Sequence, residues 1–179
     1  MAISAFLDVK GSYQIEFPDY GVLDFRFSES RLVFLSLLGD EVDLGPHPVL
    51  ATDPRVDVLM SQNKRWALIG PADGDYLYCW DASAMQMSAP IRLDRTHDDD
   101  AAFFRLQLVE QDTVILLIYE NGLICFDKEV HERWRVTHRA YGWQFERILG
   151  DLIWYKNAQG DTWAYHLADG HKVTDDDDS

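Results

Sequence analysis

The stretch Thr113 to Asp127 contains an apolar strand (Thr113 to Tyr119), a glycine turn (Asn121-Gly122) and a second strand with an aromatic residue (Leu123-Ile124-Cys125-Phe126-Asp127). Two further copies read Arg65 to Gly70, Asp73-Gly74 and Leu77-Tyr78-Cys79-Trp80-Asp81, then Leu152 to Lys156, Gln159-Gly160 and Thr162-Trp163-Ala164-Tyr165-His166. A unit that cannot bury its own apolar face must stack on copies of itself. The repetition therefore predicts a β-repeat architecture.

Four hairpins precede or contain these turns, and their spacing predicts the size of the repeat. The expected pairs are 22–27 with 31–37, 56–60 with 65–69, 103–109 with 113–119, and 143–149 with 152–156. Their first strands begin at residues 22, 56, 103 and 143, which leaves room for about four strands in each step. We expect an all-β, propeller-like domain of about four irregular four-stranded antiparallel blades over residues 1–173. The alternative is a two-sheet antiparallel sandwich.

The outer strands and the chain ends are less regular. Outer strands are expected at 85–93 and 133–137, and only the short segment 171–173 is available in the last copy. A strand at 3–9 or 13–17 would complete that last blade and close the ring. The first copy is the poorest match, so we expect a degenerate first blade. The acidic tail 174–179 is expected to be disordered and dispensable for folding.

Composition and charge bound the function. The 179 residues are 47% hydrophobic and 13% aromatic, which is ample for one folded domain. The 31 acidic residues against 16 basic ones give a charge of −15, which argues against binding nucleic acid or an anionic membrane. An acidic surface favours solubility and can steer a basic partner. With no secretory pattern and two cysteines, we expect a cytoplasmic protein with reduced thiols.

The phrase from Asp151 through Trp163-Ala164-Tyr165-His166 to Asp169-Gly170 resembles a blade of the pyrroloquinoline-quinone-like propellers. Trp80-Asp81 and Phe126-Asp127 likewise resemble the closing dipeptide of tryptophan–aspartate propellers. The Gly-His opening of those blades is missing, and nothing marks a quinone or calcium site. The resemblance therefore implies the architecture alone, with no cofactor and no catalytic residue.

The cysteines occupy a repeated position. Alignment on the glycine turn makes Cys79, Cys125 and Ala164 equivalent, and all three are small. A buried free cysteine serves as a small apolar side chain, whereas a reactive thiol needs a polarising neighbour. We therefore expect both thiols to be buried and unreactive. No spacing of cysteine or histidine supports a zinc site.

Two charged neighbourhoods supply the candidate binding residues. The first is acidic, and the choice there lies between a calcium-type loop and a solvated loop, with the solvated loop favoured. The second is basic, and it fits either an interface rich in Arg and aromatics or simple alternation along a strand. The acidic candidates are Asp94, His97, Asp98, Asp99 and Asp100, and the basic candidates are Arg133, Arg135 and Arg139.

These features favour a non-catalytic protein-binding domain that recruits a protein partner through its loops, and the acidic charge favours a basic one. One alternative is a cytosolic immunity or inhibitor protein that neutralises a basic toxin or nuclease. Another is a hydrolase or lyase, which would need Asp, Glu or His residues converging at the propeller axis. The sequence leaves open whether a ring closes within one chain or by dimerisation.

Overall fold

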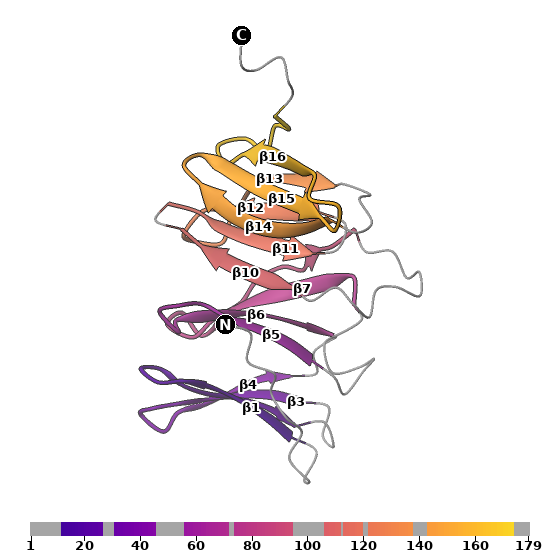
Figure 1. Cartoon of the computed structure of the whole chain (residues 1–179). Helices are drawn as coiled ribbons and strands as arrows, with labels where there is room; N and C mark the ends of the chain where they lie inside the picture. The colour runs from indigo at the N-terminus through magenta and orange to yellow at the C-terminus, as the bar shows by residue number, and fades with distance from the viewer. Residues whose placement is uncertain are drawn as a thin grey trace. The chain divides into compact units, whose positions relative to one another are not determined.

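A computed structural model of the chain shows only β-strands and turns among the residues it describes (Figure 1). These residues are 12–26, 31–45, 56–71, 74–94, 106–111, 113–119, 122–137 and 143–173. The strands form four separate antiparallel sheets, so the all-β, propeller-like fold class is confirmed. A single two-sheet sandwich is excluded for the chain. The chain divides into two compact units, Met1–Leu93 and Asp94–Ser179.

The first unit contains two up-and-down sheets. The first sheet has the order β1-β2-β3-β4, made of Ser12–Phe17, Gly21–Arg26, Arg31–Ser36 and Glu41–Gly45. The second has the order β5-β6-β7-β8, made of Val56–Met60, Trp66–Pro71, Tyr76–Asp81 and Gln86–Met87. A further strand, β9 (Ile91–Arg92), also pairs with β7. Each sheet thus has the strand order of a propeller blade.

The second unit repeats this arrangement. Its first sheet has the order β10-β11-β12-β13, made of Gln107–Glu110, Ile115–Tyr119, Gly122–Phe126 and Glu132–Thr137. Its second sheet contains β14 (Trp143–Leu149), β15 (Leu152–Asn157) and β16 (Thr162–His166). A single bridge between Tyr165 and Lys172 replaces the fourth strand.

The structure corrects three details of the repeat. The strand expected at 13–17 pairs with β2, as in Ile15 opposite Leu23, so it completes the first sheet rather than the last. The first sheet is consequently a regular four-stranded one and is not degenerate. The outer strand expected at 85–93 is split into β8 and β9, because Pro90 cannot donate a ladder hydrogen bond. The expected strand 3–9 lies outside the described residues.

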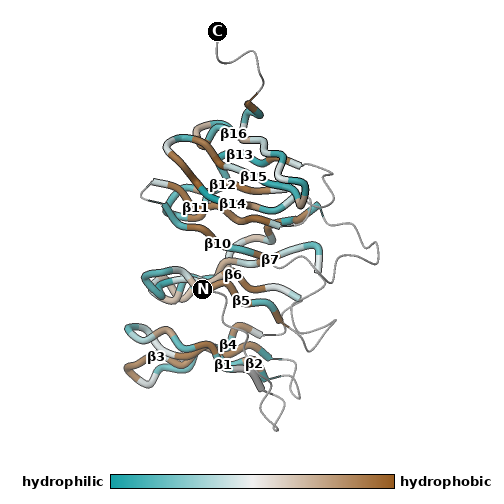
Figure 2. The backbone as a smooth tube through the Cα atoms, in the orientation of Figure 1, coloured by the Kyte–Doolittle hydropathy of each residue, from teal (hydrophilic) through white to brown (hydrophobic). Residues whose placement is uncertain are grey.

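The core of the first unit lies between its two sheets. Side chains alternate along each strand, so Leu23, Phe25 and Phe34 face one way and are buried. They belong to one hydrophobic cluster with Ile69 and Trp80 of the second sheet. The rings of Phe34 and Trp80 lie 5.1 Å apart and are tilted by 53°. Figure 2 shows hydrophobic stretches along the strands of this unit.

The core of the second unit is built in the same way and is rich in aromatic residues. Leu116, Leu123 and Cys125 belong to one buried cluster with Ile153 and Tyr155 of the other sheet. The rings of Trp143 and Trp163 stack at 4.1 Å, and the Lys172 ammonium lies 4.2 Å from the centre of the Trp163 ring. The Trp134 indole N–H donates to the Leu167 carbonyl at 3.2 Å, which ties the two sheets together.

A positive φ recurs in the turn that follows the third strand of each sheet. Gly39, Met85, Val130 and Gly170 all have a positive φ there, of 91°, 52°, 64° and 73°. Glycine adopts this left-handed conformation without a steric cost, whereas a side chain opposes it. The second and third sheets therefore carry strained residues at a position that the first and fourth sheets fill with glycine.

We expect Val130→Gly to stabilise the protein by about 0.5–1 kcal/mol. Relief of the left-handed strain, about 1–2 kcal/mol, is partly offset by the added freedom of glycine in the unfolded chain. Urea denaturation followed by circular dichroism measures this change. The control is Glu129→Gly in the same turn, where φ is not positive, and we expect it to destabilise the protein. Destabilisation by Val130→Gly as well would show that side-chain packing outweighs the strain.

Candidate functional site

Two of the candidate residues, Asp94 and Arg135, lie together at one edge of the β10–β13 sheet. The Thr137 hydroxyl donates a hydrogen bond to the Asp94 carboxylate at 3.1 Å. Arg135 precedes Thr137 by two residues on β13, so the two side chains share a face. Tyr119 of β11 is opposite Gly122 of β12, which is opposite Thr137. The cluster therefore spans three neighbouring strands.

A bulge in β13 explains the partner of Arg135. Trp134 pairs with Cys125 and Glu132 pairs with Phe126, so Arg133 is an extra residue in the ladder. This shift places Glu132 beside Arg135, and the guanidinium donates to both carboxylate oxygens at 2.8 and 2.7 Å. The hydrogen bonds from Arg135 lower the pKa of Glu132, and Glu132 in turn raises the pKa of Arg135.

The bulge also corrects the expected alternation, in which Arg133, Arg135 and Thr137 would share one face. Arg133 is exposed at the bulge, and Glu132 takes its place in the row. The expected alternation ignored the possibility of an extra residue. Residues three apart on a regular strand face opposite sides of the sheet. A Glu and an Arg at this spacing therefore predict an ion pair only where a bulge lies between them.

Tyr119 is the buried member of this cluster, with 3% of its surface exposed. Burial raises the pKa of its hydroxyl, and the nearby Asp94 carboxylate raises that pKa further. The phenol therefore stays protonated at neutral pH and is a poor base. The Thr137 hydroxyl joins Asp94 to the sheet edge, and the paired Arg135 lies on the same face of β13 as Thr137.

The remaining candidates are not brought into the site by the described structure. His97, Asp98, Asp99, Asp100 and Arg139 lie outside the described residues. Asp94 is the first residue of the acidic segment 94–100, and the rest of that segment lies outside the described residues. Tyr119, Glu132 and Thr137 were not among the candidates.

The two thiols are buried, as expected. Cys79 is 7% exposed and Cys125 is fully buried, and the equivalent Ala164 is 2% exposed. Burial raises the pKa of Cys79 to about 12 and that of Cys125 to about 11. The repeated small residue therefore serves packing in all three sheets.

We expect neither thiol to react with iodoacetamide in the native protein at pH 8, because the thiolate is the reactive species and both pKa values are far higher. Two equivalents should react in 6 M guanidinium chloride. Mass spectrometry of the intact protein counts the adducts. Fast labelling of the native chain would show that a cysteine is accessible.

The dipeptides that resemble tryptophan–aspartate blades have a structural role here. The Asp81 carboxylate accepts hydrogen bonds from the Ser83 amide at 2.9 Å and from Arg65 at 2.9 Å. Asp127 accepts bonds from the Glu129 and His131 amides at 3.0 and 2.9 Å. Burial alone would raise the pKa of Asp81, but its hydrogen bonds outweigh burial and lower it. Both aspartates close the turn that follows the third strand.

An exposed apolar turn is not evident from the sequence. The strand expected at 31–37 ends at Ser36, and Leu37 and Leu38 lie in the turn, 64% and 92% exposed. Met85, in the equivalent turn of the second sheet, is 45% exposed. The sequence predicts Leu37 at the end of one strand and Met85 at the start of another, because periodicity alone does not separate a strand end from a turn.

Other features of the described residues offer less chemistry. A hollow of about 240 Å³ lies at the end of β14 and β15, between Phe145, Glu146 and Lys156. Within the described ranges, no three His, Cys, Asp or Glu residues are placed to share a metal ion. No helix in the described part of the chain has the length and apolar character needed to cross a membrane.

Comparisons with known proteins add a likeness in structure only. No protein-family model matches the chain, and no curated protein matches it. A virginiamycin B lyase from Staphylococcus aureus is 12% identical over 93% of this chain and 59% of its own, with a TM-score of 0.45. BamB from Moraxella catarrhalis is 12% identical over 90% and 48%, with a TM-score of 0.46. The dihydro-heme d1 dehydrogenase NirN is 16% identical over 90% and 35%, with a TM-score of 0.44.

All three are proteins of the β-propeller type, and one is a lyase and another a dehydrogenase. This chain spans between about a third and three fifths of their lengths. Identities this low transfer no activity, substrate or partner to this chain.

Proposed function

We propose that this protein is a non-catalytic protein-binding domain whose partner is a basic protein. The observation that carries the proposal is the pairing of the arginines. Four of them are held by carboxylates of the same sheet, in the pairs Arg26–Asp24, Arg31–Asp43, Arg65–Asp81 and Arg135–Glu132. Each pair removes one positive and one negative charge, so the net charge of −15 remains acidic and favours a cationic partner.

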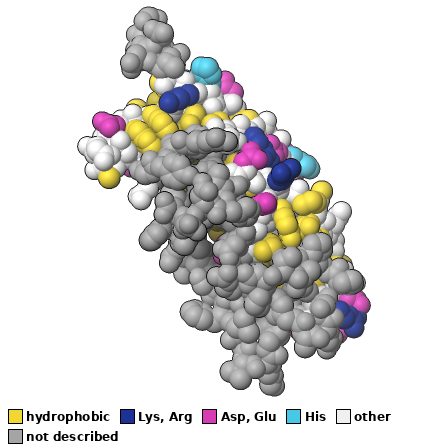
Figure 3. All heavy atoms as spheres, turned by 90° about the vertical axis from the view of Figure 1, so that its right-hand side faces the viewer, with side chains coloured by type: hydrophobic (Ala, Val, Ile, Leu, Met, Phe, Trp, Pro, Cys, Tyr) yellow, Lys and Arg dark blue, Asp and Glu magenta, His cyan; other side chains and the backbone are white. Residues whose placement is uncertain are grey.

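The arrangement of charge on the surface supports this proposal. On the face seen in Figure 3, described Lys and Arg side chains lie among Asp and Glu side chains and form no uninterrupted basic patch. The Thr137 hydroxyl fixes Asp94, where the acidic segment 94–100 begins. Carboxylates on a segment with a fixed starting point favour electrostatic steering of a cationic surface. An inhibitor of a basic toxin or nuclease is one form that this function takes.

Association kinetics with a partner captured from a native extract test the proposal. We expect the association rate to fall at least about threefold between 50 and 300 mM NaCl, because salt screens charge-steered encounters. The triple variant Asp98→Asn, Asp99→Asn, Asp100→Asn should associate more slowly than the native protein at low salt.

The control is Asp175→Asn, Asp176→Asn, Asp177→Asn, which removes the same charge at the C-terminal end of the sequence. We expect a smaller effect from this control. A rate that does not depend on salt, or an acidic partner, would contradict the electrostatic proposal. Turnover of a small molecule by the purified protein would contradict the non-catalytic role.

A further inference from the structure

The turn between β3 and β4 exposes two leucines to solvent on a backbone that is held by hydrogen bonds. The Ser36 amide donates to the Asp40 carbonyl at 2.8 Å, and the Asp40 amide donates to the Ser36 hydroxyl at 3.0 Å. The Leu37 amide donates to the Tyr20 carbonyl at 3.0 Å, which joins this turn to the β1–β2 turn. Leu37 and Leu38 remain largely exposed, although these hydrogen bonds hold the turn that carries them.

Met85 presents a third apolar side chain from the equivalent turn of the neighbouring sheet. Its φ of 52° opposes a side chain, and the equivalent residue of the first sheet is Gly39. The methionine is 45% exposed, so core packing does not account for its presence. Strained residues of this kind concentrate at functional sites.

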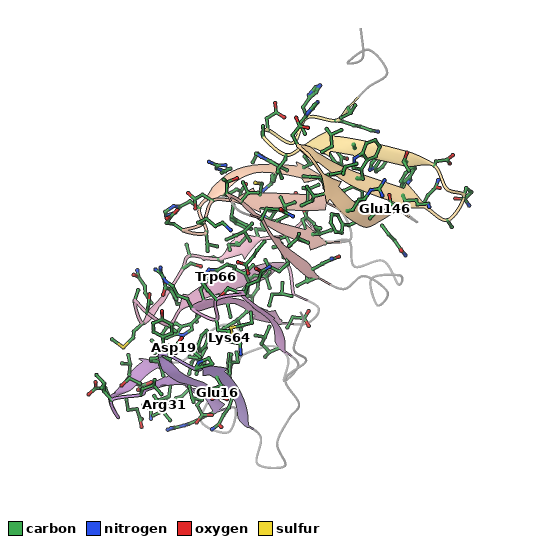
Figure 4. All side chains as sticks on the ribbon, turned by 60° about the vertical axis from the view of Figure 1, so that its left-hand side comes forward. Glu16, Asp19, Arg31, Lys64, Trp66 and Glu146 are labelled. Atoms are coloured by element: carbon green, nitrogen blue, oxygen red, sulfur yellow. The ribbon has the colours of Figure 1, made fainter. Side chains whose placement is uncertain are left out.

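These turns lie at the same end of the first unit. The two sheets share one hydrophobic cluster, and Figure 1 draws the β1–β2, β3–β4, β5–β6 and β7–β8 turns on one side of this unit. In Figure 4, Asp19 of the β1–β2 turn and Lys64 of the β5–β6 turn mark this end of the two sheets. Leu37, Leu38 and Met85 are called the apolar turn surface below.

Acidic side chains predominate around the apolar turn surface. Four carboxylates stand on or next to these turns, against two cations. Asp81 is paired with Arg65, and Glu41 lies 3.8 Å from the Arg26 guanidinium, which leaves two carboxylates against one cation. The carboxylates are Asp19, Asp40, Glu41 and Asp81, and the cations are Lys64 and Arg65. A binding segment of matching chemistry has an apolar centre and basic flanks.

We propose that the apolar turn surface binds a protein segment in which Leu, Ile, Phe or Met residues are flanked by Lys or Arg. Flexible methionine side chains adapt to varied apolar ligands, and the fixed leucine turn limits the ordering cost of binding. This surface belongs to the first unit and shares no residue with the Asp94 segment. Its test is therefore independent of the electrostatic proposal above.

A random 12-residue peptide library displayed on phage tests the proposal. Selection is run in parallel on the full-length native chain and on the double variant Leu37→Ser, Leu38→Ser. We expect peptides that bind the native chain and lose at least about tenfold in affinity for the variant, with Lys or Arg on both sides of an apolar pair. Methyl NMR of the native chain should show the Met85 resonance shifting on addition of such a peptide.

Leu149→Ser is the matched control, because Leu149 is 59% exposed and belongs to the second unit. We expect its peptide affinity to equal that of the native chain. Thermal melts establish that all variants are folded. The proposal is overturned if no selected peptide binds the double variant more weakly than the native chain, or if the selected peptides carry acidic flanks. It is also overturned if Leu149→Ser loses as much peptide affinity as the double variant, or if the Met85 resonance does not shift. It is also overturned if Leu37→Ser, Leu38→Ser abolishes self-association of the native chain, since the occupant would then be a second copy.

Discussion

Replacing Trp80 with alanine is expected to lower the free energy of unfolding by about 3–5 kcal/mol. Trp80 is fully buried between the two sheets of the first unit, and its ring lies 5.1 Å from that of Phe34. Alanine removes the indole from this layer and leaves a cavity that neighbouring strands cannot fill, because their hydrogen-bond ladders fix them. Urea denaturation followed by far-UV circular dichroism measures the loss.

Two further variants separate cavity formation from the loss of a polar group. The Trp80 indole N–H is buried and has no acceptor among the described residues. Trp80→Phe removes this N–H and keeps most of the ring, so it should cost less than half as much as alanine. Leu38→Ala, at a residue that is 92% exposed, should stay within about 0.5 kcal/mol of the native protein. Equal costs for Trp80→Phe and Trp80→Ala would contradict the cavity argument.

Gly122→Ala is expected to destabilise the second unit by about 2–3 kcal/mol or more. A Cβ at this position would lie 2.1 Å from the Val136 carbonyl oxygen and 3.1 Å from the Tyr119 hydroxyl. The carbonyl belongs to the backbone of β13, so relief of the clash requires β12 and β13 to separate. Thermal unfolding followed by circular dichroism measures the change.

Gly150→Ala is the matched control for this substitution. Gly150 has a φ of 63°, and an added methyl group would meet no atom within 4 Å beyond its chain neighbours. The cost should therefore be limited to left-handed strain, about 1–2 kcal/mol. A Gly122→Ala variant that is no less stable than Gly150→Ala would show that the strands of this sheet yield easily.

Local sequence patterns were sufficient to predict much of the fold. The pairs β2 with β3, β5 with β6 and β14 with β15 follow from alternation bounded by turn residues, and the structure confirms them. The place of β1 was predicted wrongly, in the last sheet, because a strand near the chain end carries no signal for its partner. Only the register of Ile15 against Leu23 resolves that choice.

The candidate site was less predictable, for a physical reason. Charge marked Asp94 and Arg135 as candidates, but their common location depends on the Thr137 hydroxyl, and the pairing of Arg135 with Glu132 depends on the β13 bulge. A single extra residue reverses the facing of every side chain beyond it. The exposure of Leu37 was not predicted for a related reason, since a hydrophobic residue looks the same in sequence whether a strand continues or ends.

Apart from β9, which pairs with β7, the described strands pair with the strands that precede or follow them in the chain. Pairing of near neighbours keeps loop closure short, and such chains form their contacts quickly and locally. Each hairpin therefore has the chance to close as soon as its second strand leaves the ribosome, and within each unit the first completed sheet offers a template for the second. Folding of this chain is expected to be a stepwise extension that does not wait for the C-terminal residues to be synthesised.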